Sequence, residues 1–117
     1  CSFLVSKKII PVVIGAGNDI NSIQVIQNIE NKILNLYNKS PLDVIYNLSL
    51  NALGALSNDT GPAHIIAAAN CRIHLVLSTF SENQPTIPQS KNVSFTKSNS
   101  IDEITSSQVI NKINLFL

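Results

Sequence analysis

The sequence predicts an α/β protein with a Rossmann-like parallel sheet and helices on both faces of that sheet. Apolar runs of strand length alternate with segments of helical periodicity along the 117 residues, and the runs end in glycine or polar turn residues. Hydrophobic residues make up 44% of the chain and charged residues 13%, which is typical of a globular protein. We therefore expect a single Rossmann-like domain over residues 1–117.

The first expected strand is the apolar run Ile9–Ile14, which ends in a turn at Gly15 and Gly17. Its β-branched residues favour a buried parallel strand. Gly15-x-Gly17 resembles half of a dinucleotide fingerprint, but the third glycine is missing and a plain turn is favoured. A helix should follow to about Leu34. Its candidate caps are Asn18, Asp19 and Asn21, and Asp19 is alternatively a ligand for a ribose.

Further strands and helices alternate along the chain. Leu34–Tyr37 is a short strand candidate, and Ser40 with Pro41 starts the next helix with serine as its cap. The next expected strands are Leu53–Ser57 and Ile73–Leu77. The helix between them should end near Asn70, which tolerates the left-handed cap conformation. We interpret His74 as a satisfied core or interface histidine.

The last third of the chain begins with a long polar connection, residues 78–100, which contains an edge strand at Val93–Phe95. Thr105–Gln108 is a capping-box pattern that opens a final helix. The apolar side of that helix consists of Val109, Ile110, Ile113 and Leu117.

The stretch Asn58–His64 lies between an apolar run and an alanine-rich helical segment, so it reads as a strand-loop-helix junction. Asp59 or Thr60 can cap the helix, Gly61 gives the turn backbone freedom, and Pro62 fits the first helical turn. Backbone N–H groups at such a helix start attract phosphate, and His64 adds a donor. Plain turn chemistry explains the same residues without a ligand.

Asn58–His64, followed by Ala67–Ala69, resembles the signature of the heptosyltransferases of glycosyltransferase family 9. Asn38–Leu42 and Val12–Gly17 resemble two other segments of that family, as does Asp102–Thr105 with Val109. The family moves heptose from ADP-heptose to the inner core of lipopolysaccharide with two Rossmann-like lobes in the GT-B arrangement. The resemblance implies that this chain is most of the C-terminal, donor-binding lobe, and therefore an incomplete Rossmann-like domain.

The resemblance also implies a set of donor-binding residues and no metal or other cofactor. Thr60 and Gly61 would meet the donor diphosphate or sugar, Asp59 would hold sugar hydroxyls or the loop, and His64 would contact phosphate. Lys39 and Ser40 are weaker candidates near the nucleotide base. The full candidate set is Asp59, Thr60, Gly61, Pro62, His64, Lys39, Ser40, Gly15 and Gly17, and in a parallel sheet these loops should gather beyond the carboxyl ends of the strands.

Several positions depart from the family pattern. Asn70 and Arg72 stand where the family has glycine and proline, and Leu77-Ser78 stands where it has Phe-Gly. No residue matches the family's catalytic base, so no catalytic residue is assigned. The chain begins with Cys1 and contains no Met, from which we expect a fragment whose acceptor-binding lobe is absent.

Composition limits the partners and the location. The eight basic residues are scattered and the formal net charge is +1, which argues against nucleic acid. Cys1 and Cys71 have no metal-ligand spacing, and Cys71 reads as a small buried filler. From this composition we expect a cytoplasmic protein without a transmembrane segment. The resemblance implies a peripheral position at the cytoplasmic face of the inner membrane, with a nucleotide-sugar donor and a lipopolysaccharide acceptor as partners.

Two other interpretations stay open at the level of sequence. The first is a GT-B enzyme that uses a UDP- or GDP-sugar, or an epimerase of nucleotide sugars. The second is a truncated, non-catalytic α/β remnant, or a small module that binds phosphate or nucleotide through the Asn58–His64 loop.

Overall fold

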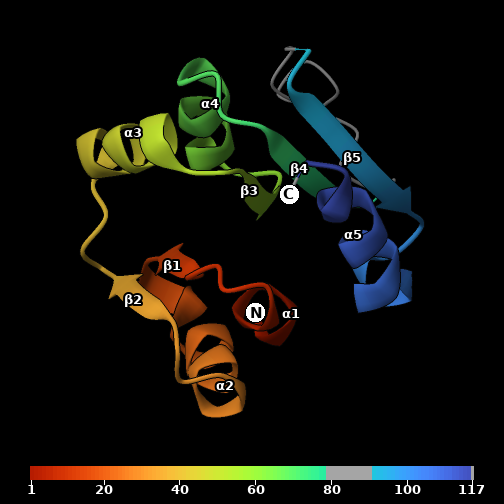
Figure 1. The fold of residues 1–117 in the computed structure, drawn as a ribbon, viewed down its shortest axis with the longest axis horizontal. Coiled ribbons are helices and arrows are strands. Elements are labelled where there is room, and N and C mark those ends of the chain that lie inside the picture. Colours follow the sequence, from red (N-terminus) through yellow and green to blue (C-terminus); the bar gives the residue numbers. More distant parts are fainter. Residues whose placement is uncertain (79–90, 117) are drawn as a thin grey trace. The chain divides into compact units, whose positions relative to one another are not determined.

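The computed structural model describes residues 1–78 and 91–116 as a mixed α/β protein with parallel sheets flanked by helices, as predicted (Figure 1). The chain divides into two compact units, Cys1–Pro41 and Leu42–Leu117, and each unit is described here by itself. The first contains a two-stranded sheet and the second a three-stranded sheet. The expectation of one domain over residues 1–117 stays a prediction.

The first unit is a βαβ arrangement preceded by a short helix. Strands β1 and β2 pair in parallel, with Val12 opposite Leu34 and Gly15 opposite Tyr37. The elements are α1 (Ser2–Ser6), β1 (Val12–Gly15), the 3-10 turn η1 (Gly17–Asp19), α2 (Ile20–Ile29) and β2 (Leu34–Tyr37).

Two sequence predictions fail in this unit. The helix predicted to reach about Leu34 ends at Ile29, because Glu30 is extended and its carboxylate accepts from the Lys32 N–H at 3.0 Å. The predicted strand begins at Val12 instead of Ile9, and Val12 is 41% exposed, so the apolar run does not form a fully buried strand.

The second unit contains a three-stranded parallel sheet in the order β3-β4-β5. The predicted strand at Val93–Phe95 is confirmed at the edge of this sheet and extends to Ser98. The elements are α3 (Leu42–Asn51), β3 (Ala55–Asn58), α4 (Gly61–Ala68), β4 (Ile73–Ser78), β5 (Val93–Ser98), η3 (Ile101–Glu103), α5 (Ser106–Ile113) and η4 (Asn114–Phe116).

The core of the second unit is built around β4, the central strand, which both α4 and α5 contact. Ile73 and Leu75 are fully buried and Leu77 is nearly so. Alternation along the strand puts these three side chains on one face and His74 on the other. Cys71 is buried as predicted, and burial raises the pKa of its thiol, so it behaves as a small core residue.

Local signals at two helix ends are confirmed. The Thr105 hydroxyl accepts from the Gln108 N–H at 3.2 Å, and the Gln108 side chain accepts from the Thr105 N–H at 2.8 Å, which is the predicted capping box. Asn70 adopts φ +58°, the left-handed conformation expected after α4. Leu117, predicted to face the core from the last helix, lies outside the described residues.

Candidate functional site

Strand β3 ends at Asn58, and the loop residues Asp59 and Thr60 follow it. Helix α4 then begins at Gly61. Thr60 takes the N-cap position with extended backbone, but its side chain makes no capping hydrogen bond, so the predicted hydroxyl cap is wrong for Thr60. Instead the Thr60 hydroxyl lies 3.3 Å from Ser57 Oγ, which itself donates to the Asn58 carbonyl at 2.9 Å. Since Ser57 has only one hydroxyl proton, Thr60 is the donor in that pair.

The start of α4 therefore offers fewer donors than a typical helix N-terminus. Pro62 has no N–H group, and the Ala63 N–H is taken by the Thr60 carbonyl at 3.1 Å. The Gly61 N–H and the positive end of the helix dipole are what remains for an anion.

Gly61 is not required by the local backbone. Its φ lies outside the left-handed region, and a Cβ built on it would meet no atom of the described chain within 4 Å. The expectation that Gly61 supplies special backbone freedom is therefore wrong. As far as residues 1–78 and 91–116 are concerned, the side of Gly61 where a side chain would stand is open.

Asp59 and His64 flank this opening. The imidazole of His64 is exposed on the first turn of α4, and Asp59 is half-buried. Parallel pairing places the loop at the carboxyl-terminal edge of the β3-β4-β5 sheet, which is the usual ligand edge of such sheets.

The candidate residues of the first unit form a second, separate group. The Gly17 N–H donates to Asn38 Oδ1 at 3.3 Å, the Tyr37 hydroxyl donates to the Gly17 carbonyl at 2.7 Å, and the Asn38 N–H donates to the Gly15 carbonyl at 2.9 Å. The turn after β1 is thus tied to the turn after β2.

The fold itself requires glycine at both Gly15 and Gly17. Gly17 has φ +55°, a conformation that glycine adopts without strain. A Cβ on Gly15 would lie 2.7 Å from Ile23 Cδ1 and 3.1 Å from Asp19 Oδ2, so glycine allows α2 to pack closely. The plain-turn interpretation explains both residues without a nucleotide.

Two polar residues of the first unit do not make the helix caps predicted for them. Asp19 accepts from the Ala16 N–H at 3.0 Å and makes no side-chain cap for α2. The Ser40 hydroxyl donates to the Leu36 carbonyl at 3.3 Å, and α3 starts at Leu42, so Ser40 is not its cap. Lys39 is exposed. Gly15, Gly17, Lys39 and Ser40 come together in the first unit, and Asp59–His64 belong to the second unit.

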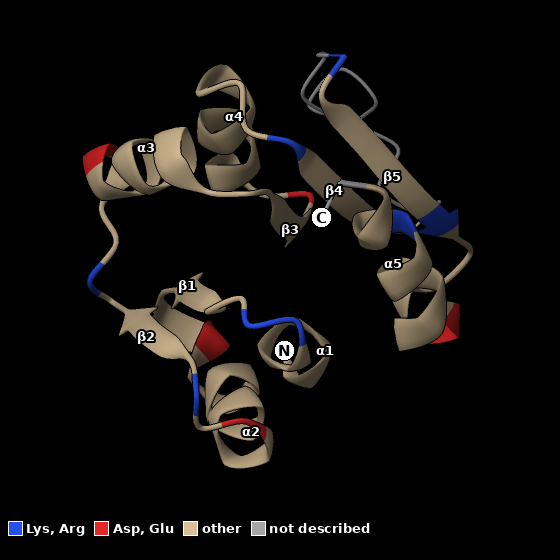
Figure 2. Ribbon diagram, in the orientation of Figure 1, with Lys and Arg blue, Asp and Glu red and all other residues tan. Residues whose placement is uncertain are grey.

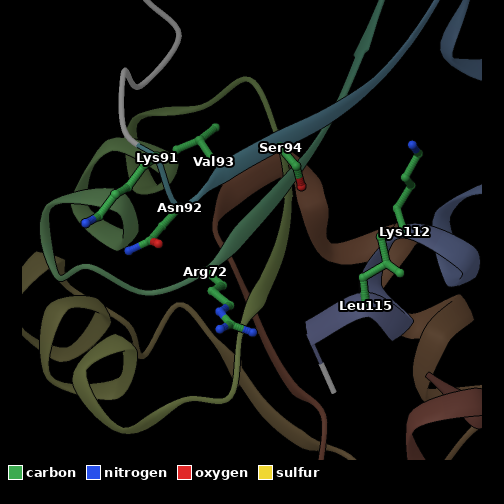
Figure 3. A pocket seen from close by; sticks show the side chains of 7 residues that line it. All are labelled: Arg72, Lys91, Asn92, Val93, Ser94, Lys112 and Leu115. Atoms are coloured by element: carbon green, nitrogen blue, oxygen red, sulfur yellow. The ribbon is translucent and has the colours of Figure 1, made fainter.

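A hollow lined by basic residues, which the sequence analysis did not predict, lies at the amino-terminal ends of the strands of the second sheet. Its volume is about 410 Å³, and its described lining residues are Arg72, Lys91, Asn92, Val93, Ser94, Lys112 and Leu115 (Figure 3). Arg72 immediately precedes β4, and Lys91 and Asn92 immediately precede β5. The signal that identifies it is a cation before each of two adjacent strands. Elsewhere Lys and Arg are spread over several elements, as predicted (Figure 2).

His74, the register partner of the lining residue Ser94, is fully buried, which confirms a satisfied core histidine. Its Nδ1 lies 2.7 Å from Ser94 Oγ and its Nε2 lies 2.7 Å from Thr96 Oγ1, both on β5. Burial, and secondarily the positive charge of Lys112, lower the pKa of His74, so the ring is held neutral.

Among the described residues, no group of three or more His, Cys, Asp or Glu side chains is placed to hold a metal ion. No helix in the described ranges is both long enough and apolar enough to cross a bilayer. Comparison of the chain with protein-family models, with curated proteins and with solved structures gives no match.

Proposed function

We propose that this chain is the donor-binding domain of a heptosyltransferase-like glycosyltransferase, which holds the diphosphate of a nucleotide-sugar such as ADP-heptose at the start of α4. The observation that carries the proposal is the open Gly61 position. Among the described residues, neither φ nor packing requires this glycine and no atom stands in front of it, which leaves room for a ligand to approach the backbone.

The chemistry at this position suits a leaving diphosphate. The Gly61 N–H and the dipole of α4 stabilise negative charge, and the exposed His64 ring supplies a second donor. Asp59 accepts from sugar hydroxyls. The Thr60 hydroxyl can bind the ligand only if its hydrogen bond to Ser57 breaks, so it contributes less to binding than the backbone N–H does.

Transfer with inversion also needs a base that deprotonates the acceptor hydroxyl. The proposal assigns that base to no residue of this chain. In the same proposal the acceptor is the core of lipopolysaccharide, and the enzyme works in the cytoplasm, peripherally at the inner membrane.

Calorimetric titration of the chain with ADP-heptose and with ADP tests the proposal. We expect saturable heat with both ligands. His64→Gln should weaken the binding of both several-fold, whereas Asp59→Asn should weaken ADP-heptose only, because ADP lacks the sugar whose hydroxyls Asp59 is proposed to hold. Asp43→Asn, the same change at an exposed position on α3, serves as the matched charge control and should bind as the unchanged chain does. Absence of heat with the unchanged chain would remove the proposal.

The rival interpretations differ in what the same site binds. A thermal-shift panel of ADP, UDP and GDP, with and without sugar, separates a heptosyltransferase-like donor site from a GT-B site for UDP- or GDP-sugars. A shift with inorganic phosphate that no nucleotide exceeds would identify a phosphate-binding module. No shift with any member of the panel favours the non-catalytic remnant.

A further inference from the structure

Three of the chain's eight basic residues line the hollow at the amino-terminal edge of the β3-β4-β5 sheet. Arg72, Lys91 and Lys112 are all exposed, and none of the described lining residues is acidic. In Figure 3 the side chains of Lys91, Arg72 and Lys112 extend in different directions. Its volume of about 410 Å³ is within the range of small-molecule sites.

Helix polarity accounts for only part of this charge. Lys112 lies in the last turn of α5, where a cation is stabilised by the helix dipole. Lys91 lies on no helix and Arg72 follows the end of α4 by several residues, beyond the last turn in which the dipole acts. Among the described residues, helix polarity therefore accounts for the charge of Lys112 and not for that of Arg72 or Lys91.

The hydroxyl of Ser94 connects the hollow to buried His74. A neutral imidazole carries one N–H and one bare nitrogen, so one of its two hydroxyl partners must donate and the other accept. When Nδ1 carries the proton, it donates to Ser94 Oγ, and Thr96 donates to Nε2. In that tautomer the Ser94 hydroxyl proton is free to point into the hollow.

We propose that this hollow binds a small ligand through a phosphate or diphosphate group. The planar guanidinium of Arg72 is suited to two parallel hydrogen bonds to phosphate oxygens. The long side chains of Lys91 and Lys112 swing toward the bound charge. Ser94 donates its hydroxyl proton to the ligand, and His74 shifts to the Nδ1–H tautomer to support it.

This site is distinct from the proposed donor site. The Gly61 opening follows the carboxyl end of β3, whereas Arg72 and Lys91 precede the amino ends of β4 and β5. Parallel strands put these two sets of residues at opposite edges of one sheet.

The test is an NMR titration of the whole chain with pyrophosphate. We expect shifts centred on residues 72–74, 91–94 and 112, and a change of the His74 ring nitrogens toward the Nδ1–H tautomer. Arg72→Gln should raise the dissociation constant about tenfold, and Lys112→Gln somewhat less. Lys97→Gln is the matched control, because Lys97 is an exposed lysine on β5 outside the hollow, and it should change binding less than about twofold.

Three outcomes would overturn the proposal. The first is a set of shifts confined to residues 59–64, and the second is a dissociation constant that Arg72→Gln leaves unchanged. The third is no response up to about 10 mM pyrophosphate, because a dissociation constant above that concentration is too weak for a specific site. A response to duplex DNA without one to pyrophosphate would show a polyanion surface instead of a phosphate site. Ser94→Ala separates the two parts of the mechanism: weaker binding with intact folding supports the hydroxyl contact, and unchanged binding refutes it.

Discussion

His74 Nδ1 and Ser94 Oγ lie 2.7 Å apart across the β4-β5 pair, in which these two residues are register partners. The hydroxyls of Ser94 and Thr96 together satisfy both nitrogens of a ring that has no exposed surface. A polar side chain in a core is tolerated because its hydrogen bonds are complete. Protonation would keep both hydrogen bonds, because each hydroxyl can accept from a ring N–H, but it would bury a positive charge that no acidic side chain among the described residues neutralises and that Lys112 repels.

The stability of the protein should therefore fall in mild acid. The folded-state pKa of His74 is lowered from its ordinary value of 6.5, by burial first and by Lys112 second. Above pH 6.5 the ring is neutral in both states and contributes no pH dependence. Below pH 6.5 His74 binds a proton in the unfolded chain while it stays neutral in the folded chain. The free energy of unfolding therefore declines by up to about 1.4 kcal/mol per pH unit until the pH reaches the folded-state pKa.

Urea unfolding at pH 8, 6.5 and 5.5 measures this decline. His74→Gln should remove the part of the slope due to this residue, whereas the substitution of exposed His64 by Gln should leave it. An NMR titration of the His74 ring in the unchanged protein gives the same answer without a variant. A midpoint at or above pH 6.5 would contradict the argument.

Gly61→Ala should separate folding from ligand binding. A Cβ at this position meets no atom of the described chain within 4 Å, and φ is not left-handed. Alanine lowers the entropy of the unfolded chain, so the free energy of unfolding should rise by about 0.4–1 kcal/mol. The same methyl group would stand where the donor diphosphate is proposed to approach, so ADP affinity should fall about tenfold, or about 1.4 kcal/mol.

Urea unfolding and calorimetry on this one variant test the two effects independently. Gain of stability with unchanged ADP affinity would argue against the proposed donor site and leave the fold unaffected. Ala68→Gly, an exposed position at the other end of α4, is the control for helix propensity and should not change ADP affinity.

Gly15→Ala and Gly17→Ala should both destabilise the protein, for different reasons. At Gly15 the new methyl group would stand 2.7 Å from Ile23 Cδ1, and overpacking of this kind costs about 1–3 kcal/mol. At Gly17 the space is open, but φ +55° costs about 1–2 kcal/mol for alanine.

A double-mutant cycle with Ile23→Val distinguishes the two causes. Removal of Cδ1 relieves the contact at residue 15, so Gly15→Ala should cost less in the Ile23→Val background than in the unchanged chain. Gly17→Ala and Ile23→Val should be additive within about 0.5 kcal/mol. Equal coupling of Ile23→Val to both glycine substitutions would show that packing is not what requires Gly15.

Thr105→Ala should cost about 1 kcal/mol of the free energy of unfolding, because it removes the hydroxyl that accepts from the Gln108 N–H. Ser106→Ala is the neighbouring control, since Ser106 is exposed within the helix and should change stability by less than about 0.5 kcal/mol. Chemical denaturation of both variants measures the difference. Equal losses would mean that the cap is not what stabilises α5.

The elements that local patterns determine were predictable from the sequence. The capping box at Thr105, the left-handed Asn70 and the edge strand beginning at Val93 each depend on neighbouring residues only. The end of α2 was not, because the apolar positions continue past Ile29 while the backbone turns at Glu30. The spacing of apolar residues indicates which face of a helix is buried, but it does not indicate at which residue the helix ends.

The candidate sites show the same division. The strand-loop-helix junction at Asp59–His64 was visible as turn chemistry, but the hydrogen bond of Thr60 to Ser57, in place of a cap, depends on tertiary geometry. The basic hollow was not visible, because Arg72, Lys91 and Lys112 are far apart in the sequence. Only the parallel register of β4 with β5 brings the first two to one edge.

Strand β4 is the one strand of its sheet with a hydrogen-bonded neighbour on each side, within the described part of the chain. Its amide protons can therefore reach solvent only when β3 or β5 separates from it, and the buried residues beside them add to the cost of that separation. In a deuterium-exchange experiment residues 73–77 should be the last of the second unit to acquire label. Their rate would then report the opening of the whole sheet.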